Sequence, residues 1–139
     1  MKRRVLAIIV AAACVAVTLV VVFAVPIVPH SEPFNLSQTL STGSTAFNGY
    51  PDCGPNVTTH LDYPSTGTIS YRMAQNDSDA TVDVWWISDD SYAFESTGMG
   101  TDQGTMTSGD YTITMKGCGP DPTVSLGLWG FVNYTAPLV

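Results

Sequence analysis

The chain has 139 residues, of which 12% are charged, and a formal net charge of −7 at pH 7. All 12 acidic residues lie at or after Glu32, where only Arg72 and Lys116 are basic, so this part of the chain carries a charge of −10. Nucleic acids and anionic lipid surfaces bind proteins through basic patches, and the composition therefore predicts no nucleic-acid partner.

The N-terminal residues predict a membrane-spanning helix. Three cations, Lys2, Arg3 and Arg4, precede an uncharged and almost wholly apolar run from Val5 to Val25. As a helix these 21 residues extend about 31 Å, which matches a hydrocarbon core of about 30 Å. The positive-inside rule keeps the cationic end in the cytoplasm and exports the remainder. We therefore expect a single-pass protein of the cell membrane with an extracytoplasmic C-terminal domain.

A cleaved signal peptide is the alternative to a retained anchor. Val22-Phe23-Ala24 has the small-residue spacing that signal peptidases cleave, and Pro26 and Pro29 follow it. The apolar region of a signal peptide typically has about 7–15 residues, fewer than the run observed here. This length favours the anchor.

We divide the chain into an N-terminal anchor (residues 1–25), a Pro-rich tether (residues 26–33) and one extracytoplasmic domain (residues 34–139). A domain of roughly 105 residues buries one hydrophobic core but is too short for two.

The exported part reads as an all-β domain. Short segments with alternating apolar and polar residues are separated by Gly, Pro, Asn and Asp. We expect strands, in chain order, at residues 36–40, 44–50, 57–61, 68–73, 80–88, 110–116, 123–129 and 131–134. The Gly- and Thr-rich residues 95–108 are expected to form a long loop. Seven or eight such strands predict a two-sheet antiparallel sandwich, jelly-roll-like, after one N-terminal transmembrane helix.

The order of these segments resembles a known kind of domain. A strand leads into Asn76-Asp77-Ser78-Asp79, an apolar strand with a polar turn and aromatic residues follows over residues 82–94, and another alternating strand covers residues 109–115. This rhythm is similar to the small jelly-roll sandwiches of bacterial pre-peptidase C-terminal and GOLD-like domains, over residues 35–134. The resemblance implies an accessory, targeting or interaction domain and brings no catalytic residues.

Two cysteines outside the apolar run are expected to form a disulfide. Cys53 and Cys118 each lie beside Gly in a Pro-containing turn, and an exported domain matures in an oxidising compartment. Two unpaired thiols are the alternative. Without His or further Cys at ligand spacing, the pair does not indicate a zinc site.

Four asparagines match the acceptor pattern for N-glycosylation, Asn-x-Ser/Thr. They matter only in a host that has the modifying enzymes, where they mark exposed turns and strand edges. The candidates are Asn35, Asn56, Asn76 and Asn133.

Two kinds of ligand site are suggested by side-chain type. Flat aromatic rings on a sandwich bind sugars, which makes Trp85, Trp86 and Trp129 candidates, although neighbours on a strand point to opposite faces and one of the first two belongs in the core. Carboxylates are the ligands of calcium, and Asp77, Asp79 and Asp83 lie within one turn and its following strand. A solvated acidic turn is the alternative to a metal site.

The sequence carries no catalytic signature. The exported part has two histidines, His30 and His60, of which His60 has Asp62 nearby, and it has no Gly-x-Ser-x-Gly motif. We expect no enzyme and no cofactor.

The sequence thus predicts a membrane-anchored, non-catalytic cell-surface module for interaction or structure, whose partner is another surface protein or a second copy joined by strand addition. The alternatives are a carbohydrate- or calcium-binding surface module and a subunit of a surface filament.

Overall fold

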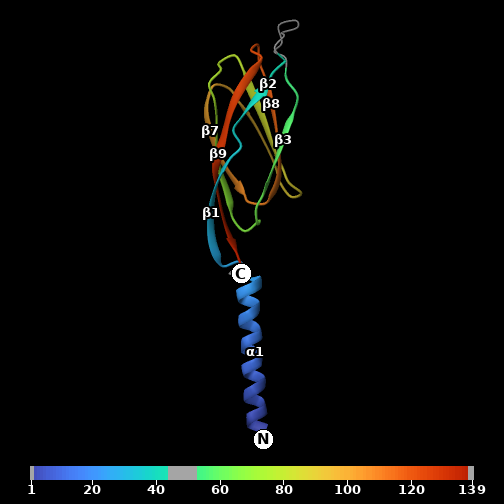
Figure 1. Ribbon diagram of the computed structural model, residues 1–139, viewed down its shortest axis with the longest axis vertical. Coiled ribbons are helices and arrows are strands. Elements are labelled where there is room, and N and C mark those ends of the chain that lie inside the picture. The colour runs from blue at the N-terminus through green and yellow to red at the C-terminus, as the bar shows by residue number, and fades with distance from the viewer. Residues whose placement is uncertain (1, 44–52, 138–139) are drawn as a thin grey trace.

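The computed structural model describes residues 2–43 and 53–137, which form one helix and a two-sheet β-sandwich standing on its end (Figure 1). The helix α1 (Lys2–Ala24) is exposed where its side chains are described and is long and apolar enough to cross a membrane. Pro26 lies two residues beyond the end of α1, and proline lacks the N–H that would continue a helix.

All strand pairs in the sandwich are antiparallel. One sheet has the order β1-β9-β4-β7, with β2 also paired to β9, and the other has the order β3-β8-β5-β6. β9 has 14 residues, which is long enough to pair with β1 near the helix and with β2 at the far end. The strands are β1 (Val28–Asn35), β2 (Gln38–Ser41), β3 (Val57–Asp62), β4 (Thr68–Gln75), β5 (Thr81–Ile87), β6 (Tyr92–Thr97), β7 (Gly100–Thr107), β8 (Asp110–Cys118) and β9 (Thr123–Ala136).

The core lies between the two sheets and is built by alternate residues of each strand. Trp86 is its largest fully buried side chain, and its ring packs 5.0 Å from that of Tyr71 and 6.2 Å from that of Tyr111, centroid to centroid. Among the side-chain nitrogen and oxygen atoms that are buried in the described residues, only Trp86 Nε1 lacks a hydrogen-bond partner. The core thus depends on aromatic packing from both sheets.

The predicted fold class is confirmed: two antiparallel sheets follow one apolar helix. The strands expected at residues 57–61, 68–73, 80–88 and 110–116 are present within one or two residues of the expected ends. The two strands expected over residues 123–134 are a single strand, β9, and the strand expected at residues 36–40 begins later, at Gln38. The strand expected at residues 44–50 lies outside the described residues.

The expectation of a long loop over residues 95–108 is wrong. β6 (Tyr92–Thr97), which was not among the expected strands, ends inside this range, and β7 occupies Gly100–Thr107, paired along its length with β4. β7 is an edge strand, and Met106 is its one side chain that packs against the core. It therefore has no need of the alternating apolar residues by which a half-buried strand is recognised.

The Pro-rich segment is also not a free tether, because Val28–Pro33 belongs to β1 and pairs with the end of β9. Pro29 and Pro33 are tolerated because β1 is an edge strand, where a missing backbone N–H breaks no ladder on its outer side. The Ile27 N–H donates to Ala136 O at 3.0 Å. The sandwich therefore begins within a few residues of the helix, and both its ends lie beside it (Figure 1).

Candidate functional site

The outer face of the five-stranded sheet carries a shallow groove across β9, β4 and β7. The register places Trp129, Arg72 and Gln103 in one row across these strands, and Phe131, Ser70 and Thr105 in the next row. The groove has a volume of about 640 Å³. We call these six side chains the Trp129 face.

The Trp129 ring lies over a glycine. A Cβ atom added to Gly127, two residues earlier on the same side of β9, would come within 2.8 Å of Trp129 Cζ3 and 3.3 Å of Cε3. The indole therefore packs where no side chain separates it from the strand backbone, while 37% of the residue remains exposed. Phe131, the next outward residue, is 54% exposed. Two aromatic side chains are thus presented to solvent along one strand.

Polar side chains extend the row away from Trp129. Arg72 and Gln103 are exposed, and within the described part of the chain neither side chain has a hydrogen-bond or ion-pair partner. A guanidinium has only donors, whereas a glutamine amide has donors and an acceptor. The row therefore combines an aromatic surface with unengaged groups able to bind hydroxyls.

The backbone beneath the row is fixed from the core side. Tyr71 lies between Gly104 of β7 and Gly130 of β9 in the register, and a Cβ atom on Gly104 would come within 2.4 Å of the Tyr71 hydroxyl. That hydroxyl donates to Glu95 Oε2 at 2.7 Å. Burial, followed by this hydrogen bond and the charge of Glu95, raises the pKa of Tyr71, so it stays protonated and keeps donating.

The opposite sheet has a second exposed aromatic group. Trp85 and Phe94 are cross-strand neighbours with ring centroids 5.3 Å apart, and Lys116 Nζ lies 5.5 Å from the centre of the Trp85 ring. Ile87 and Tyr92 form the adjacent pair and are exposed. We call Trp85, Ile87, Tyr92 and Phe94 the Phe94 patch.

The three tryptophans named as sugar-stacking candidates do not form one site, as the alternation of Trp85 and Trp86 along one strand predicted. Trp85 and Trp86 point to opposite faces, and Trp86 is fully buried. Of the three tryptophans, Trp129 lines the groove. Phe131, Arg72 and Gln103 line it too, and the sequence analysis did not identify them. Residues 129 and 131 alternate with the buried Leu128 and Val132, and this alternation would have placed Phe131 on the same outer face as Trp129. Gln103 gave none, because it lay in the expected loop.

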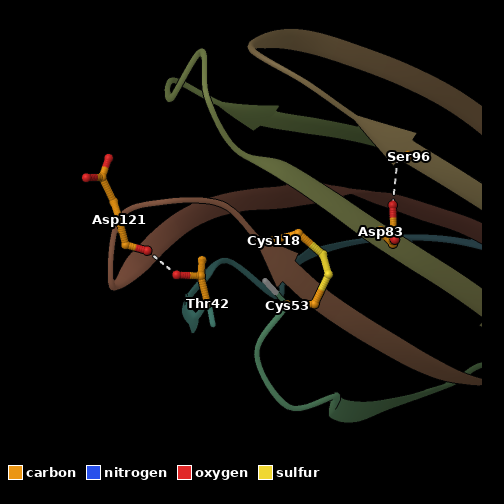
Figure 2. Close-up of a disulfide and its surroundings, with 6 residues drawn as sticks. All are labelled: Thr42, Cys53, Asp83, Ser96, Cys118 and Asp121. Carbon is orange, nitrogen blue, oxygen red and sulfur yellow. Dashed lines mark hydrogen bonds between the residues drawn. A yellow bond between two sulfur atoms is a disulfide. The ribbon is translucent and has the colours of Figure 1, made fainter. Parts of the chain in front are cut away.

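The calcium candidates are not gathered. Asp77 Oδ1 accepts from the Asp79 N–H at 2.9 Å, as in a turn, whereas Asp83 on β5 accepts from the Ser96 hydroxyl at 2.6 Å (Figure 2). In residues 2–43 and 53–137, no group of three or more His, Cys, Asp or Glu side chains is placed to hold a metal ion.

His60 pairs with a different carboxylate from the one that sequence proximity indicated. Its Nε2 lies 2.6 Å from Asp110 Oδ1, and both side chains are exposed. Asp62, two residues along β3, lies opposite Asp110 in the register. The pair joins β3 to β8 at the surface of the sandwich.

The Cys53–Cys118 disulfide is present and ties the segment before β3 to the end of β8 (Figure 2). Close to it, the Thr42 hydroxyl donates to the backbone carbonyl of Asp121. An apolar N-terminal helix, as signal or anchor, together with a disulfide indicates the secretory pathway and an extracytoplasmic sandwich.

The four glycosylation candidates are all exposed and lie at different places. Asn35 and Asn133 belong to β1 and β9, on the side of the sheet that carries the Trp129 face. Asn56 precedes β3 of the other sheet, and Asn76 follows β4.

Comparison with known proteins identifies no family. No protein-family model matches the chain, and no curated protein matches it. The resemblance to pre-peptidase C-terminal and GOLD-like domains therefore stays a prediction. A solved structure of TmCBM61 in complex with β-1,4-galactotriose is similar at a TM-score of 0.41 and 8% identity, over 76% of this chain and 88% of that one. A likeness of this size carries no argument about function.

Proposed function

We propose that this protein is a non-catalytic module, anchored in a membrane by α1, whose extracytoplasmic sandwich binds a neutral carbohydrate chain on the Trp129 face. One observation carries the proposal. The Trp129 ring lies over Gly127 at one end of a groove in which Arg72 and Gln103 continue the same row.

The chemistry of the row fits a sugar. A pyranose ring has apolar C–H groups on its faces and hydroxyls around its edge, so it packs on a flat aromatic ring while its hydroxyls seek hydrogen bonds. Beside the Trp129 ring, Arg72 supplies donors and Gln103 supplies both donors and an acceptor. Three adjacent strands span roughly 10 Å, which leaves room for a sugar chain lying across the sheet.

Charge favours a neutral ligand. The exported part carries twelve acidic residues and two basic ones. Arg72 is the one cation among the groove-lining residues, and the net negative charge of the exported part repels polyanions. A neutral polysaccharide meets no such barrier.

The position of the groove suits a ligand outside the membrane. Trp129 lies seven residues before Ala136, the end of β9 beside the helix, so the row stands roughly 24 Å beyond that end. The Trp129 face therefore lies on the side of the sandwich, parallel to the membrane normal, and is well clear of the headgroups.

The test is replacement of the ring. We expect the detergent-solubilised full chain, made in a host without N-glycosylation, to bind at least one neutral member of a polysaccharide panel, and Trp129→Ala to weaken that binding at least tenfold. The matched control is Trp85→Ala, which removes a tryptophan from the opposite face and should leave binding within twofold of the wild type. Binding to no neutral polysaccharide, or equal loss in both variants, would overturn the proposal.

A second function, contact with another protein, is favoured by the Phe94 patch. Its three most exposed members, Ile87, Tyr92 and Phe94, are apolar or aromatic, and the nearby cation, Lys116, already lies against Trp85. Exposed apolar groups of this kind mark protein interfaces. A second copy in the same membrane is the simplest partner. Cross-linking of Phe94→Cys chains in membranes would support it, and Thr105→Cys, on the opposite sheet, is the control that should not cross-link.

A further inference from the structure

Asn35 is the direct cross-strand neighbour of Trp129. The two residues oppose each other in the β1–β9 register and point to the same outer side of the sheet. Side chains at such positions have Cβ atoms about 4.5–5.5 Å apart. Whatever is attached to Asn35 therefore lies beside the indole ring.

Asn35 has the local geometry of an accessible glycan acceptor. Asn35-Leu36-Ser37 is one of the four acceptor sequences, and Asn35 is exposed. Its Oδ1 accepts from the Ser37 N–H at 2.9 Å, so this hydrogen bond engages the amide oxygen and leaves Nδ2 for the modification. In the described residues, Nδ2 has no hydrogen-bond partner.

The other acceptor asparagines lack this juxtaposition. Asn133 lies on the same side of the sheet, but it is four residues from Trp129 along β9 and opposes Ser31 of β1. Asn56 belongs to the opposite sheet's side, and Asn76 lies in the turn after β4.

From this juxtaposition we infer that Asn35 is an N-glycosylation site whose first sugar stacks on Trp129, so that modification covers the Trp129 face. The covering is independent of any ligand, whereas its consequence, control of polysaccharide binding by modification, rests on the proposed function. Asn35 thereby decides whether the face is open or filled by the chain's own sugar.

The modification uses a lipid-pyrophosphate-linked oligosaccharide as co-substrate. The Asn35 amide nitrogen attacks the anomeric carbon of the first sugar and loses one proton. A new carbon–nitrogen bond forms, the bond from the anomeric carbon to the phosphate oxygen breaks, and the lipid pyrophosphate leaves with the electron pair. No oxidant or reductant takes part.

We expect the first sugar to pack against the Trp129 indole ring rather than to extend into solvent. Glycosylation extends Asn35 along its Nδ2, and the nearest exposed apolar surface on β9 is the Trp129 ring over Gly127. A sugar held there by a covalent bond has a high effective concentration, in the millimolar range or above, and excludes a free ligand of modest affinity.

The experiment uses the full chain in detergent, expressed in a eukaryotic host that performs N-glycosylation. Intact glycopeptide mass spectrometry should find Asn35 occupied. Nuclear magnetic resonance should show the N-acetyl methyl or ring protons of the first sugar shifted upfield by the indole, and Trp129→Leu should remove the shift. An empty Asn35, or an occupied one without the shift, would overturn the inference.

A matched pair of variants tests the consequence for binding. Asn35→Asp removes the acceptor but keeps an oxygen for the Ser37 N–H, and it should raise polysaccharide binding of the eukaryotic product at least tenfold. Asn56→Asp removes a distant acceptor with the same charge change and should have no effect. If no form of the chain binds polysaccharide while the upfield shift is present, the proposed function fails and the covering of Trp129 by the Asn35 glycan stands.

Discussion

At the scale of single residues, glycines decide where the aromatic side chains lie. Gly127 leaves the space that the Trp129 ring occupies on the outer face, and Gly104 leaves the space of the Tyr71 hydroxyl on the core face. Both glycines lie within a strand, but they face opposite sides of the sheet. Gly127 shapes the groove that we propose binds carbohydrate, and Gly104 shapes the core.

Substitution of Gly127 by Ala should separate binding from stability. The new Cβ would lie 2.8 Å from Trp129 Cζ3, an atom at the far end of a partly exposed side chain that is free to move. We expect polysaccharide binding to fall at least fivefold while the free energy of unfolding changes by less than about 1 kcal/mol, because alanine is tolerated better than glycine in a strand.

Gly104→Ala is the informative contrast, since its Cβ would meet the buried Tyr71 ring and its hydroxyl. We expect it to destabilise by about 1–3 kcal/mol, as overpacking does. Urea unfolding and a polysaccharide binding assay on both variants measure the difference. Unaltered binding in Gly127→Ala would show that the position of the ring is unimportant.

Asp121 makes the stability of the far end of the sandwich dependent on pH. Hydrogen bonding with the Asp77 side chain, followed by the charge of Asp77, raises the pKa of Asp121 above its ordinary value of 3.8. Between 3.8 and this raised pKa the folded chain holds more protons than the unfolded chain, so this group's contribution to stability is complete below 3.8 and is lost as the pH rises through the folded pKa.

Asp121→Asn removes this titration and keeps the backbone carbonyl that binds Thr42. The variant should match the wild type at pH 3 and have a higher thermal midpoint at pH 7. Thermal unfolding followed by circular dichroism across this range measures the difference. Asp89→Asn, at the opposite end of the sandwich, controls for the change in net charge, and an equal gain in both variants would contradict the assignment to Asp121.

At the scale of elements, the sequence predicted the strands that bury one face and missed the strands that do not. Residues 80–88 alternate because Val82, Val84 and Trp86 fill the core, and these apolar residues make the strand recognisable from the sequence. β7 and the first half of β1 are exposed edges whose pairing is decided by β4 and β9. Their own sequences carry Gly in β7 and Pro in β1, which favour turns, and they lack the alternating apolar residues of a half-buried strand.

The candidate site was predictable only in part for the same reason. Trp129 was identified by its side-chain type, but its neighbours Arg72 and Gln103 lie 57 and 26 residues away in the sequence and join it only through the register of three strands. Such a row depends on topology. The acidic turn shows the converse, since nearby carboxylates in the sequence were not gathered into a metal site.

The disulfide reinforces a connection that the β3–β8 ladder and the β-bridge between Cys53 and Cys118 already make. Cys53 and Cys118 close a separation of 65 residues, which corresponds to about 4 kcal/mol on the chain-entropy model. Replacing both by Ser should lower the free energy of unfolding by about 2–4 kcal/mol, and addition of reductant to the wild type should have the same effect. Denaturant unfolding with and without reductant measures it. Insensitivity of the wild type to reductant would show that the bridge does not support the fold.

At the scale of the whole molecule, helix and sandwich are closely joined. Only three residues separate Ala24 of α1 from Val28 of β1, and the far end of β9 returns to the same place (Figure 1). In the anchored protein that we propose, the sandwich stands at the membrane surface with its disulfide end outermost. The Trp129 face lies along its side, so the carbohydrate chain that we propose as its ligand would run parallel to the membrane.

The orientation in the membrane should depend on the three N-terminal cations. Replacing Lys2, Arg3 and Arg4 together by Gln removes the charge bias that keeps this end in the cytoplasm, so a larger share of chains should leave the sandwich inside.

Two readouts report independently on which side of the membrane the sandwich lies. Protease added to intact cells digests only an exported sandwich, and Cys53 and Cys118 resist maleimide only where an oxidising compartment has paired them. The wild type should be protease-sensitive, maleimide-resistant and present in carbonate-washed membranes at its full mass. Recovery of the wild type only as a soluble product that begins near Val25 would show that α1 is a cleaved signal. The charge substitution would then lower the amount of secreted protein, and no disulfide-bonded sandwich would be found in the membrane fraction.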